Sequence, residues 1–266
     1  MNSKYHQVTI EPELNHAFSA ASGGADILFD WHAFEIPKGT CIIKSFAGIV
    51  MGNNGAADNG DDFSLYFAKS IDGVAPPTFG TVHAAQNATQ SAKFRRHIIG
   101  YMYADMSSID DADNLVGYNV IGSRSAASAD ITADGGHNTH VFLQGEDTPF
   151  KGDSNYSATT QGSQTIWVAA MAEGAAFDFG TDVDLNMGGN QAASTAAVQI
   201  TTDSTDPRTV FAPGDLIKGE TGTVTMEVVS VDSATTMTVK DVSAQIDDDE
   251  QLIFRHPMRF MLGLEY

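Results

Sequence analysis

The sequence predicts an all-β protein, built as an antiparallel β-sandwich of jelly-roll type that carries a small inserted β-barrel of SH3-like or OB-like kind. Short apolar runs alternate with polar residues along most of the chain, and turn residues, including 25 Gly, lie between these runs. No stretch has the period of a helix of ordinary length. Hydrophobic residues make up 42% of the 266 residues, which is sufficient for a real core.

The first 24 residues are expected to form an N-terminal arm. Tyr5 to Ile10 alternate briefly, and the chain then loosens into small and polar residues that end at Gly24. Such a segment either packs on a neighbour or stays mobile. The sandwich is therefore expected over residues 25–187 together with residues 258–266.

The sandwich opens with two strands of different character. Residues 27–36 alternate, with aromatic side chains on one side, and end in a turn at Pro37-Lys38-Gly39. Residues 41–51 are almost continuously apolar, which predicts burial on both faces of that strand.

The middle of the chain is predicted as strands separated by polar loops. A surface loop with one helical turn is expected over residues 71–90, and Ser107 or Ser108 is placed to cap a short helix. Residues 165–171 have the pattern of a central strand. Further strands are predicted at residues 63–69, 98–103, 116–122 and 140–144.

The inserted barrel is predicted over residues 188–257 and is expected to have five strands. Its clearest part is residues 211–239, where a Pro213-Gly214 turn, a β-branched run and a hairpin through residues 232–234 follow one another. Residues 258–266 alternate again and are too hydrophobic to hang free. They are expected to complete the sandwich, so the barrel is an insertion rather than a C-terminal domain.

The charge of the chain argues against polyanionic partners. It has 34 acidic and 14 basic Lys and Arg residues, a net charge of -20, whereas binding to phosphates needs a basic surface. Nucleic acid and anionic membranes are therefore not expected as partners. The sequence also has no apolar run suited to a signal peptide or a membrane span, so we expect a protein made and kept soluble in a cytoplasm.

One basic cluster stands out on this acidic background, namely Lys93, Arg95, Arg96 and His97. One interpretation is that it docks on an acidic partner, including an acidic face of a neighbouring copy. The other is that it is a solvated strand edge that discourages aggregation.

No catalytic, cofactor-binding or metal-binding residue is predicted. Gly152-Asp153-Ser154 is similar to the nucleophile block of one class of esterases, but the other parts of that signature are missing. There is also no Gly-x-Ser-x-Gly elbow, phosphate loop or dinucleotide fingerprint. The chain is therefore expected not to be an enzyme.

Two loops and one cysteine have residue types that can react or bind ligands. His137 and His140, next to Asp134, are interpreted as loop residues without a metal, and residues 58–62 as a turn rather than a calcium loop. Cys41 is interpreted as a buried core residue, so the chain forms no internal disulfide.

The barrel segment carries a family resemblance. The cadence Phe211-x-x-Gly-Asp-x-Ile217, followed by residues 222–224, 228–231 and 235–239, resembles small β-barrel modules of structural proteins in tailed-bacteriophage virions. The acidic, lysine-poor composition also looks like that of marine-phage particle proteins. Because the chain lacks the long helix pattern of a typical shell subunit, it is most similar to capsid-decorating or cement proteins.

This resemblance implies a non-enzymatic protein of the virion, assembled in the host cytoplasm. Its partners would be the major capsid protein and further copies of itself, with a homotrimer expected. An alternative is a tail or knob component that binds host-surface glycans through exposed aromatics such as Trp31 or Tyr156. A glycan-degrading enzyme is a third hypothesis, since paired carboxylates meet only in space.

Overall fold

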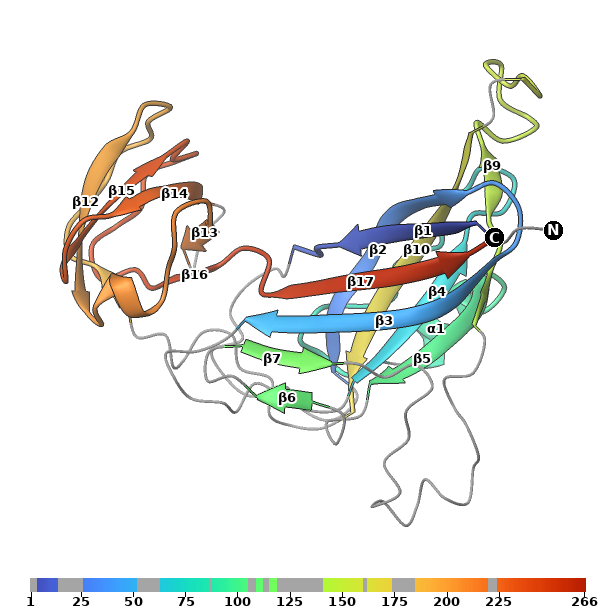
Figure 1. The fold of residues 1–266 in the computed structure, drawn as a ribbon, viewed down its shortest axis with the longest axis horizontal. Coiled ribbons are helices and arrows are strands. Elements are labelled where there is room, and N and C mark those ends of the chain that lie inside the picture. The colour runs from blue at the N-terminus through green and yellow to red at the C-terminus, as the bar shows by residue number, and fades with distance from the viewer. Residues whose placement is uncertain are drawn as a thin grey trace, which may run out of the picture.

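The computed structural model shows a β-sandwich and a small β-barrel that lie end to end (Figure 1). The structure describes residues 4–13, 26–51, 63–86, 88–104, 109–111, 115–118, 141–159, 162–173, 185–219 and 224–266. Within these residues nearly all regular structure is antiparallel β, as the alternating sequence predicts.

The first sheet of the sandwich has the strand order β1-β17-β3-β7-β6, and β8 pairs with the other half of β3. All of these pairs are antiparallel. The strands are β1 (Tyr5–Ile10), β3 (Cys41–Met51), β6 (Ile109–Asp111), β7 (Leu115–Tyr118), β8 (Phe142–Leu143) and β17 (Met258–Glu265).

The second sheet has the order β2-β10-β4-β5, and β9 pairs with one end of β10. It is also antiparallel throughout. Its strands are β2 (Ile27–Pro37), β4 (Phe63–Lys69), β5 (Ile98–Ala104), β9 (Glu146–Thr148) and β10 (Ser163–Ala172).

This pairing confirms the jelly-roll prediction. The chain passes repeatedly between the sheets, with β4 and β5 as neighbours in the second one, so that β1-β17-β3-β7 faces β2-β10-β4-β5. This is the two-sheet order of an eight-stranded jelly roll. β17 enters the first sheet between β1 and β3. The barrel therefore interrupts the chain between β10 and β17, as residues 258–266 predict.

The sandwich core lies between the two sheets and is centred on Phe260 of β17. Its ring lies 6.0 Å from that of Phe29, 5.7 Å from that of Phe46 and 5.8 Å from that of Phe63, measured between ring centroids. Phe46 belongs to the same sheet, whereas Phe29 and Phe63 come from the opposite one. The alternation of β17 thus places its apolar side chains in contact with both layers.

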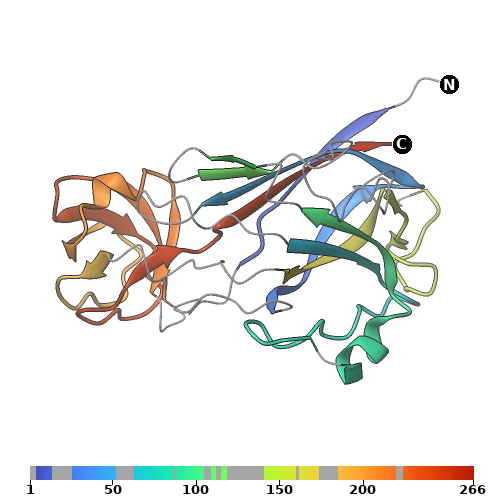
Figure 2. The same cartoon turned by 90° about the horizontal axis from the view of Figure 1, so that it is seen from below.

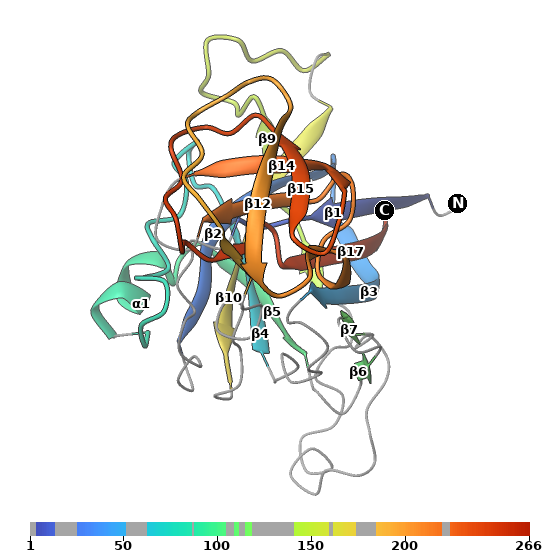
Figure 3. The ribbon, with the colours of Figure 1, turned by 90° about the vertical axis from the view of Figure 1, so that its left-hand side faces the viewer.

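The barrel contains six strands among the described residues, in the order β11-β12-β15-β14-β13-β16. They are β11 (Leu185–Met187), β12 (Val198–Ser204), β13 (Leu216–Gly219), β14 (Thr225–Val231), β15 (Thr236–Lys240) and β16 (Leu252–Phe254). The last strand returns to the first through a bridge between Asn186 and Gln251, so the sheet is nearly closed (Figure 3). Closure leaves little free strand edge.

The barrel differs from its prediction in one boundary and one strand. Leu185 and Met187 are fully buried in the barrel core, and their strand β11 pairs with β12. The predicted boundary at residue 188 and the prediction of five strands are therefore wrong. In the sequence, apolar residues recur at Phe177, Phe179, Val183 and Leu185, and such a pattern fits a strand of either domain. It therefore did not show that the barrel begins before residue 188.

Two further sequence predictions differ from the structure. Tyr5 to Ile10, predicted within an N-terminal arm, form β1 and pair along their length with β17, because Val8 and Ile10 enter the sandwich core. Residues 14–25 of that arm lie outside the described residues. The helix expected after Ser107 or Ser108 is also wrong, since Ile109–Asp111 pairs with β7 as a strand.

The two sheets differ in what covers their outer faces. Residues 71–97, including helix α1 (Ala88–Phe94), run over the outside of the second sheet, where Phe79 and Phe94 pack against Trp31. In Figure 2 the helix lies beyond this sheet, on the side away from the first one. Among the described residues, no segment covers the outer face of β1-β17-β3, which is called the open face from here on.

In the part of the chain that the structure describes, no helix has the length and apolar character that a membrane crossing requires.

Candidate functional site

The open face is the outer surface of β1, β17 and β3, and it combines small, apolar and polar side chains with charged residues near both ends. Because Val8, Ile10 and the even-numbered residues of β17 point into the core, the alternate residues point outward. Register places them in rows across the three strands. The face consists of Tyr5, Gln7, Thr9, Ile42, Ser45, Ala47, Ile49, Arg259, Met261, Gly263 and Glu265.

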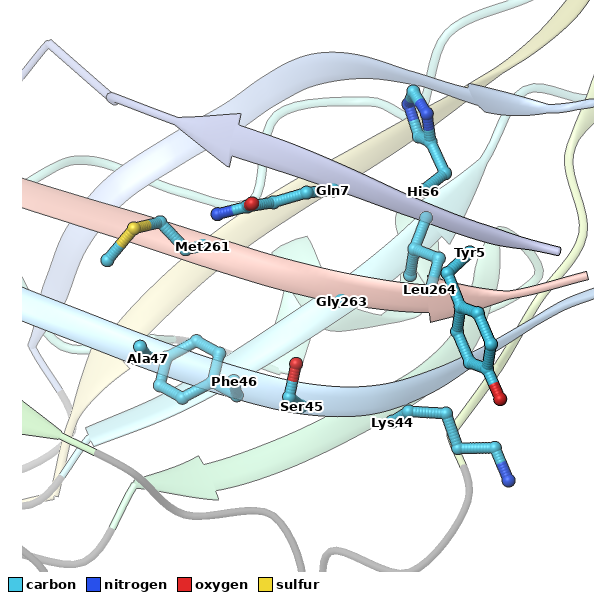
Figure 4. A pocket seen from close by; sticks show the side chains of 10 residues that line it. All are labelled: Tyr5, His6, Gln7, Lys44, Ser45, Phe46, Ala47, Met261, Gly263 and Leu264. Carbon is cyan, nitrogen blue, oxygen red and sulfur yellow. The ribbon is translucent and has the colours of Figure 1, made fainter.

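A shallow hollow of about 630 Å³ lies in this face. Figure 4 shows Gln7, Met261 and Ser45 around the position of Gly263, with Tyr5 at one end. A Cβ atom at Gly263 would collide with the Ser45 hydroxyl as it is placed, so a larger residue there would require the Ser45 side chain to turn away. The rim carries an ion pair of 2.8 Å between Lys44 Nζ and Glu265 Oε2.

The apolar sequence of strand β3 accounts for part of the open face. Its apolar run predicts burial on both faces, but only the inward side chains, such as Ile43 and Phe46, are buried. Ile42 and Ile49 point outward and remain half-exposed. The prediction is therefore wrong for Ile42 and Ile49, and no described segment covers this apolar part of β3.

The predicted basic cluster divides into two parts. Lys93 ends helix α1, and Arg95 and Arg96 lie in the turn that follows, with all three side chains exposed. His97 is only 9% exposed, and its Nδ1 lies 2.8 Å from the carbonyl oxygen of Lys69. His97 is therefore an anchor of the turn, and its prediction as a partner contact is not supported by its position.

Lys93, Arg95 and Arg96, called the cation patch from here on, are held at fixed positions by their buried neighbours. Phe94 points inward, where its ring centroid lies 5.0 Å from that of Phe79. Among the described residues, none of the three cations forms an ion pair or a side-chain hydrogen bond. The patch is thus a preformed positive surface on a negative protein.

A separate ionic contact joins the sandwich to the barrel. Arg255, which follows β16, donates from Nη2 to Glu13 Oε2 at 2.9 Å, and this hydrogen bond lowers the pKa of Glu13. Lys218 of β13 is only 3% exposed, and burial lowers its pKa while the charge of Glu13 opposes the shift. The contact fastens the segment after β1 to the barrel, and no local sequence pattern indicates it.

The aromatic residues named for glycan binding do not form an exposed platform together. The indole of Trp31 donates to the carbonyl oxygen of Pro77 at 2.8 Å, and its ring packs edge-on against Phe79 and Phe94. Trp31 is thus part of the layer that holds residues 71–97 on the sheet. Tyr156 is half-exposed in a separate turn.

The esterase-like tripeptide and the single cysteine of the sequence analysis lie in a turn and in the core. Asp153 accepts a hydrogen bond from the backbone N–H of Asn155 at 2.7 Å, so Gly152-Asp153-Ser154 belongs to a turn. Cys41 is fully buried in the sandwich core, as predicted, and burial raises the pKa of its thiol.

The other candidate ligands from the sequence, His137, His140 and residues 58–62, lie outside the described residues. Within the described residues, no three His, Cys, Asp or Glu side chains meet as a possible metal site.

Comparison with known proteins does not identify a family. No family model and no curated protein matches the chain. One similar solved structure is the crystal structure of Cucumber Necrosis Virus, at 9% identity over 98% of this chain and 95% of that chain, with a TM-score of 0.18. Another is the structure of infectious bursal disease virus Gx strain, at 8% identity over 100% of this chain but 41% of that chain, with a TM-score of 0.16. TM-scores of this size carry no argument about fold or function.

Proposed function

We propose that this chain is a non-enzymatic structural subunit of a tailed-phage virion, which decorates the outside of the capsid and stabilises it as a homo-oligomer. Its partners are the major capsid protein and further copies of itself. The observation that carries the proposal is the open face of β1-β17-β3. It is a partly apolar surface on a sandwich whose opposite face is covered by described segments of the chain itself.

The open face has the properties of a surface that docks on another protein. Ile49 and Met261 lie on neighbouring strands and provide half-exposed apolar area, and Ile42 adds a second half-exposed apolar side chain at the other end of β3. Exposed apolar area of this kind is typical of interaction sites, and here it lies between the ion pairs Arg259–Glu11 and Lys44–Glu265. Gly263 and Ala47 keep its centre low, which allows a protruding side chain or strand of a partner to approach closely. The resemblance of the barrel segment to phage virion modules supports a capsid subunit as that partner.

The barrel supports a decorating role through its position. It is inserted between β10 and β17 and lies beyond one end of the sandwich, so it extends the molecule along the direction of the sheet (Figure 1). A subunit that lies on a shell through its open face therefore places the barrel beside the contact area. There the barrel is free to meet a neighbouring subunit.

Binding to empty capsids of the parent particle tests this function. We expect the purified protein to co-sediment with the capsids and to raise the temperature at which they disrupt. Replacing Ala47 with Arg places an unpartnered charge in the docked face, so we expect binding to weaken about tenfold or more. The matched control is Val229→Arg, at a barrel side chain that is 40% exposed, which should bind as the wild type does.

The proposal fails if the wild-type protein does not bind capsids, or if the Ala47→Arg protein binds as tightly as the wild type. Binding to a glycan array that is lost on replacing Tyr156 would instead favour the tail or knob alternative.

A further inference from the structure

We propose that copies of this chain bind one another head to tail, with the cation patch of one sandwich on an acidic turn of the next copy's barrel. The acidic turn is Asp247, Asp248 and Asp249. This inference rests on the proposed function, because it assigns the surfaces through which the decorating subunit forms its homo-oligomer.

The cation patch is the first of the two surfaces. Elsewhere in the described chain, six Lys and Arg side chains already form ion pairs with carboxylates, at distances between 2.6 and 3.4 Å. Within the same described residues, Lys93, Arg95 and Arg96 have no such partner, although the chain carries 34 acidic residues. Three adjacent exposed cations therefore remain available for acids of another molecule.

The acidic turn is the second surface, and backbone hydrogen bonds and buried neighbours hold its backbone in the barrel. The N–H of Asp248 donates to Asn190 Oδ1 at 2.6 Å, and that of Asp249 donates to the carbonyl oxygen of Met187 at 2.9 Å. Ile246 and Leu252, on either side of the turn, are fully buried in the barrel core. Three consecutive exposed carboxylates are thus presented on a backbone that is already ordered.

The two surfaces belong to different domains and do not meet within one chain. The patch lies on the sandwich with helix α1, whereas the acidic turn lies in the barrel (Figures 1 and 3). No ion pair joins them among the described residues. A contact between them therefore joins two copies and not two parts of one.

A second copy fits the patch better than a polyanion does. A chain with a net charge of -20 repels nucleic acid over most of its surface, but it also repels its own copies unless opposite charges face each other. Placing the patch opposite the acidic turn neutralises both surfaces at the contact and fixes their relative orientation. Because the two surfaces differ, the contact is heterologous and repeats from one copy to the next, and it closes into a ring where the rotation between copies returns to the first one. The family resemblance implies three copies in that ring.

Charge reversal of the full chain tests this contact. We expect the wild type to be oligomeric by light scattering, and its dissociation constant to rise about tenfold or more between about 0.05 and 0.5 M NaCl. Reversing the patch with Lys93→Glu, Arg95→Glu and Arg96→Glu should convert the protein to monomers. Asp248→Lys should weaken association, whereas Asp203→Lys, the same change at another exposed barrel position, should not.

A chain that carries both sets of reversals provides the decisive comparison. It combines the three patch changes with Asp247→Lys, Asp248→Lys and Asp249→Lys, and we expect it to regain the oligomer because the attraction is restored with opposite signs. Regained assembly also shows that the reversed surfaces are correctly folded.

The inference is overturned if the wild type is monomeric, or if the patch-reversed protein keeps the wild-type mass. It is also overturned if the chain with both sets of reversals stays monomeric. Loss of duplex DNA binding in the patch-reversed protein, with its mass unchanged, would assign the patch to nucleic acid instead. Capsid binding through the open face is measured separately, so it can succeed when this contact fails.

Discussion

At the scale of single residues, Phe260 shows how one side chain holds two sheets together. It is fully buried, and the rings of Phe29 and Phe63 reach it from the opposite layer. Its position could be predicted from the sequence, because the alternation of residues 258–266 assigns it to the apolar side. Which aromatic rings it meets could not, since those residues are distant in the chain.

Replacing Phe260 with Ala should lower the free energy of unfolding of the sandwich by about 3–5 kcal/mol, because it leaves a cavity between the sheets. Replacing Phe142, whose side chain is 55% exposed, should change it by about 0.5 kcal/mol or less. Urea unfolding of both proteins measures the difference. Equal effects of the two changes would contradict the central role of Phe260.

The residue types of the basic cluster predicted the exposure of three of its four members. The run of basic residues correctly predicted that Lys93, Arg95 and Arg96 are exposed, because long charged side chains are rarely buried. It failed for His97, whose ring lies against the backbone of Lys69. An imidazole can be buried where a ring nitrogen forms a hydrogen bond with the backbone, so basic neighbours do not show where a histidine lies.

At the scale of helices and strands, pairing between strands determines the structure of segments whose local sequence fits more than one structure. β2, β10 and β17 could be predicted because alternation persists over their whole length. Ser and Asp favour helix starts and therefore predict a helix around Ile109–Asp111, but the pairing of this segment with β7 prevails over that preference. The contact between Glu13 and Arg255 joins residues that are far apart in the chain, so the local sequence does not predict it.

This contact should make stability depend on pH in a defined direction. The hydrogen bond from Arg255 lowers the pKa of Glu13 in the folded protein below its value in the unfolded chain. The folded state therefore favours the ionised carboxylate, and its contribution is present at neutral pH and is lost as pH falls through the lowered pKa.

Glu13→Gln should lower stability at pH 7 by about 1 kcal/mol, because the pair is partly exposed. As the pH falls below the ordinary pKa of a glutamate side chain, the difference from the wild type should shrink, because the wild-type carboxylate also becomes neutral. Thermal unfolding from acid to neutral pH measures this. Asp203→Asn, at an exposed acid of the barrel, is the control, and a difference for Glu13→Gln that grows on acidification would contradict the assignment.

At the scale of the whole molecule, the sandwich and the barrel have separate hydrophobic cores with no residue in common. The sequence predicted this division because the alternation of residues 258–266 returns the chain to the first domain. It did not place the boundary, since residues up to Leu185 alternate like a strand of either domain. The open face was also not predicted, because an apolar strand gives no sign of whether its cover belongs to the same chain.

Two cores should give two separable unfolding transitions. Both Trp residues of the chain, Trp31 and Trp167, lie in the sandwich, so tryptophan fluorescence reports on that domain alone. Met237→Ala in the barrel core should destabilise the barrel by about 2–5 kcal/mol and shift a calorimetric transition, but leave the fluorescence transition in place. Phe260→Ala should shift the fluorescence transition, and a single transition shifted equally by both changes would show that the domains unfold as one unit.

The position of β17 between β1 and β3 also has a consequence for the order of events during translation. Both neighbours leave the ribosome well before their shared partner, because the whole barrel is synthesised between β10 and β17. Until β17 emerges, the first sheet has a gap at its centre, and the open face, to which β17 contributes Met261 and Gly263, does not exist. A nascent chain therefore lacks its proposed docking surface until synthesis has passed through the barrel, so a partly made chain cannot bind through it.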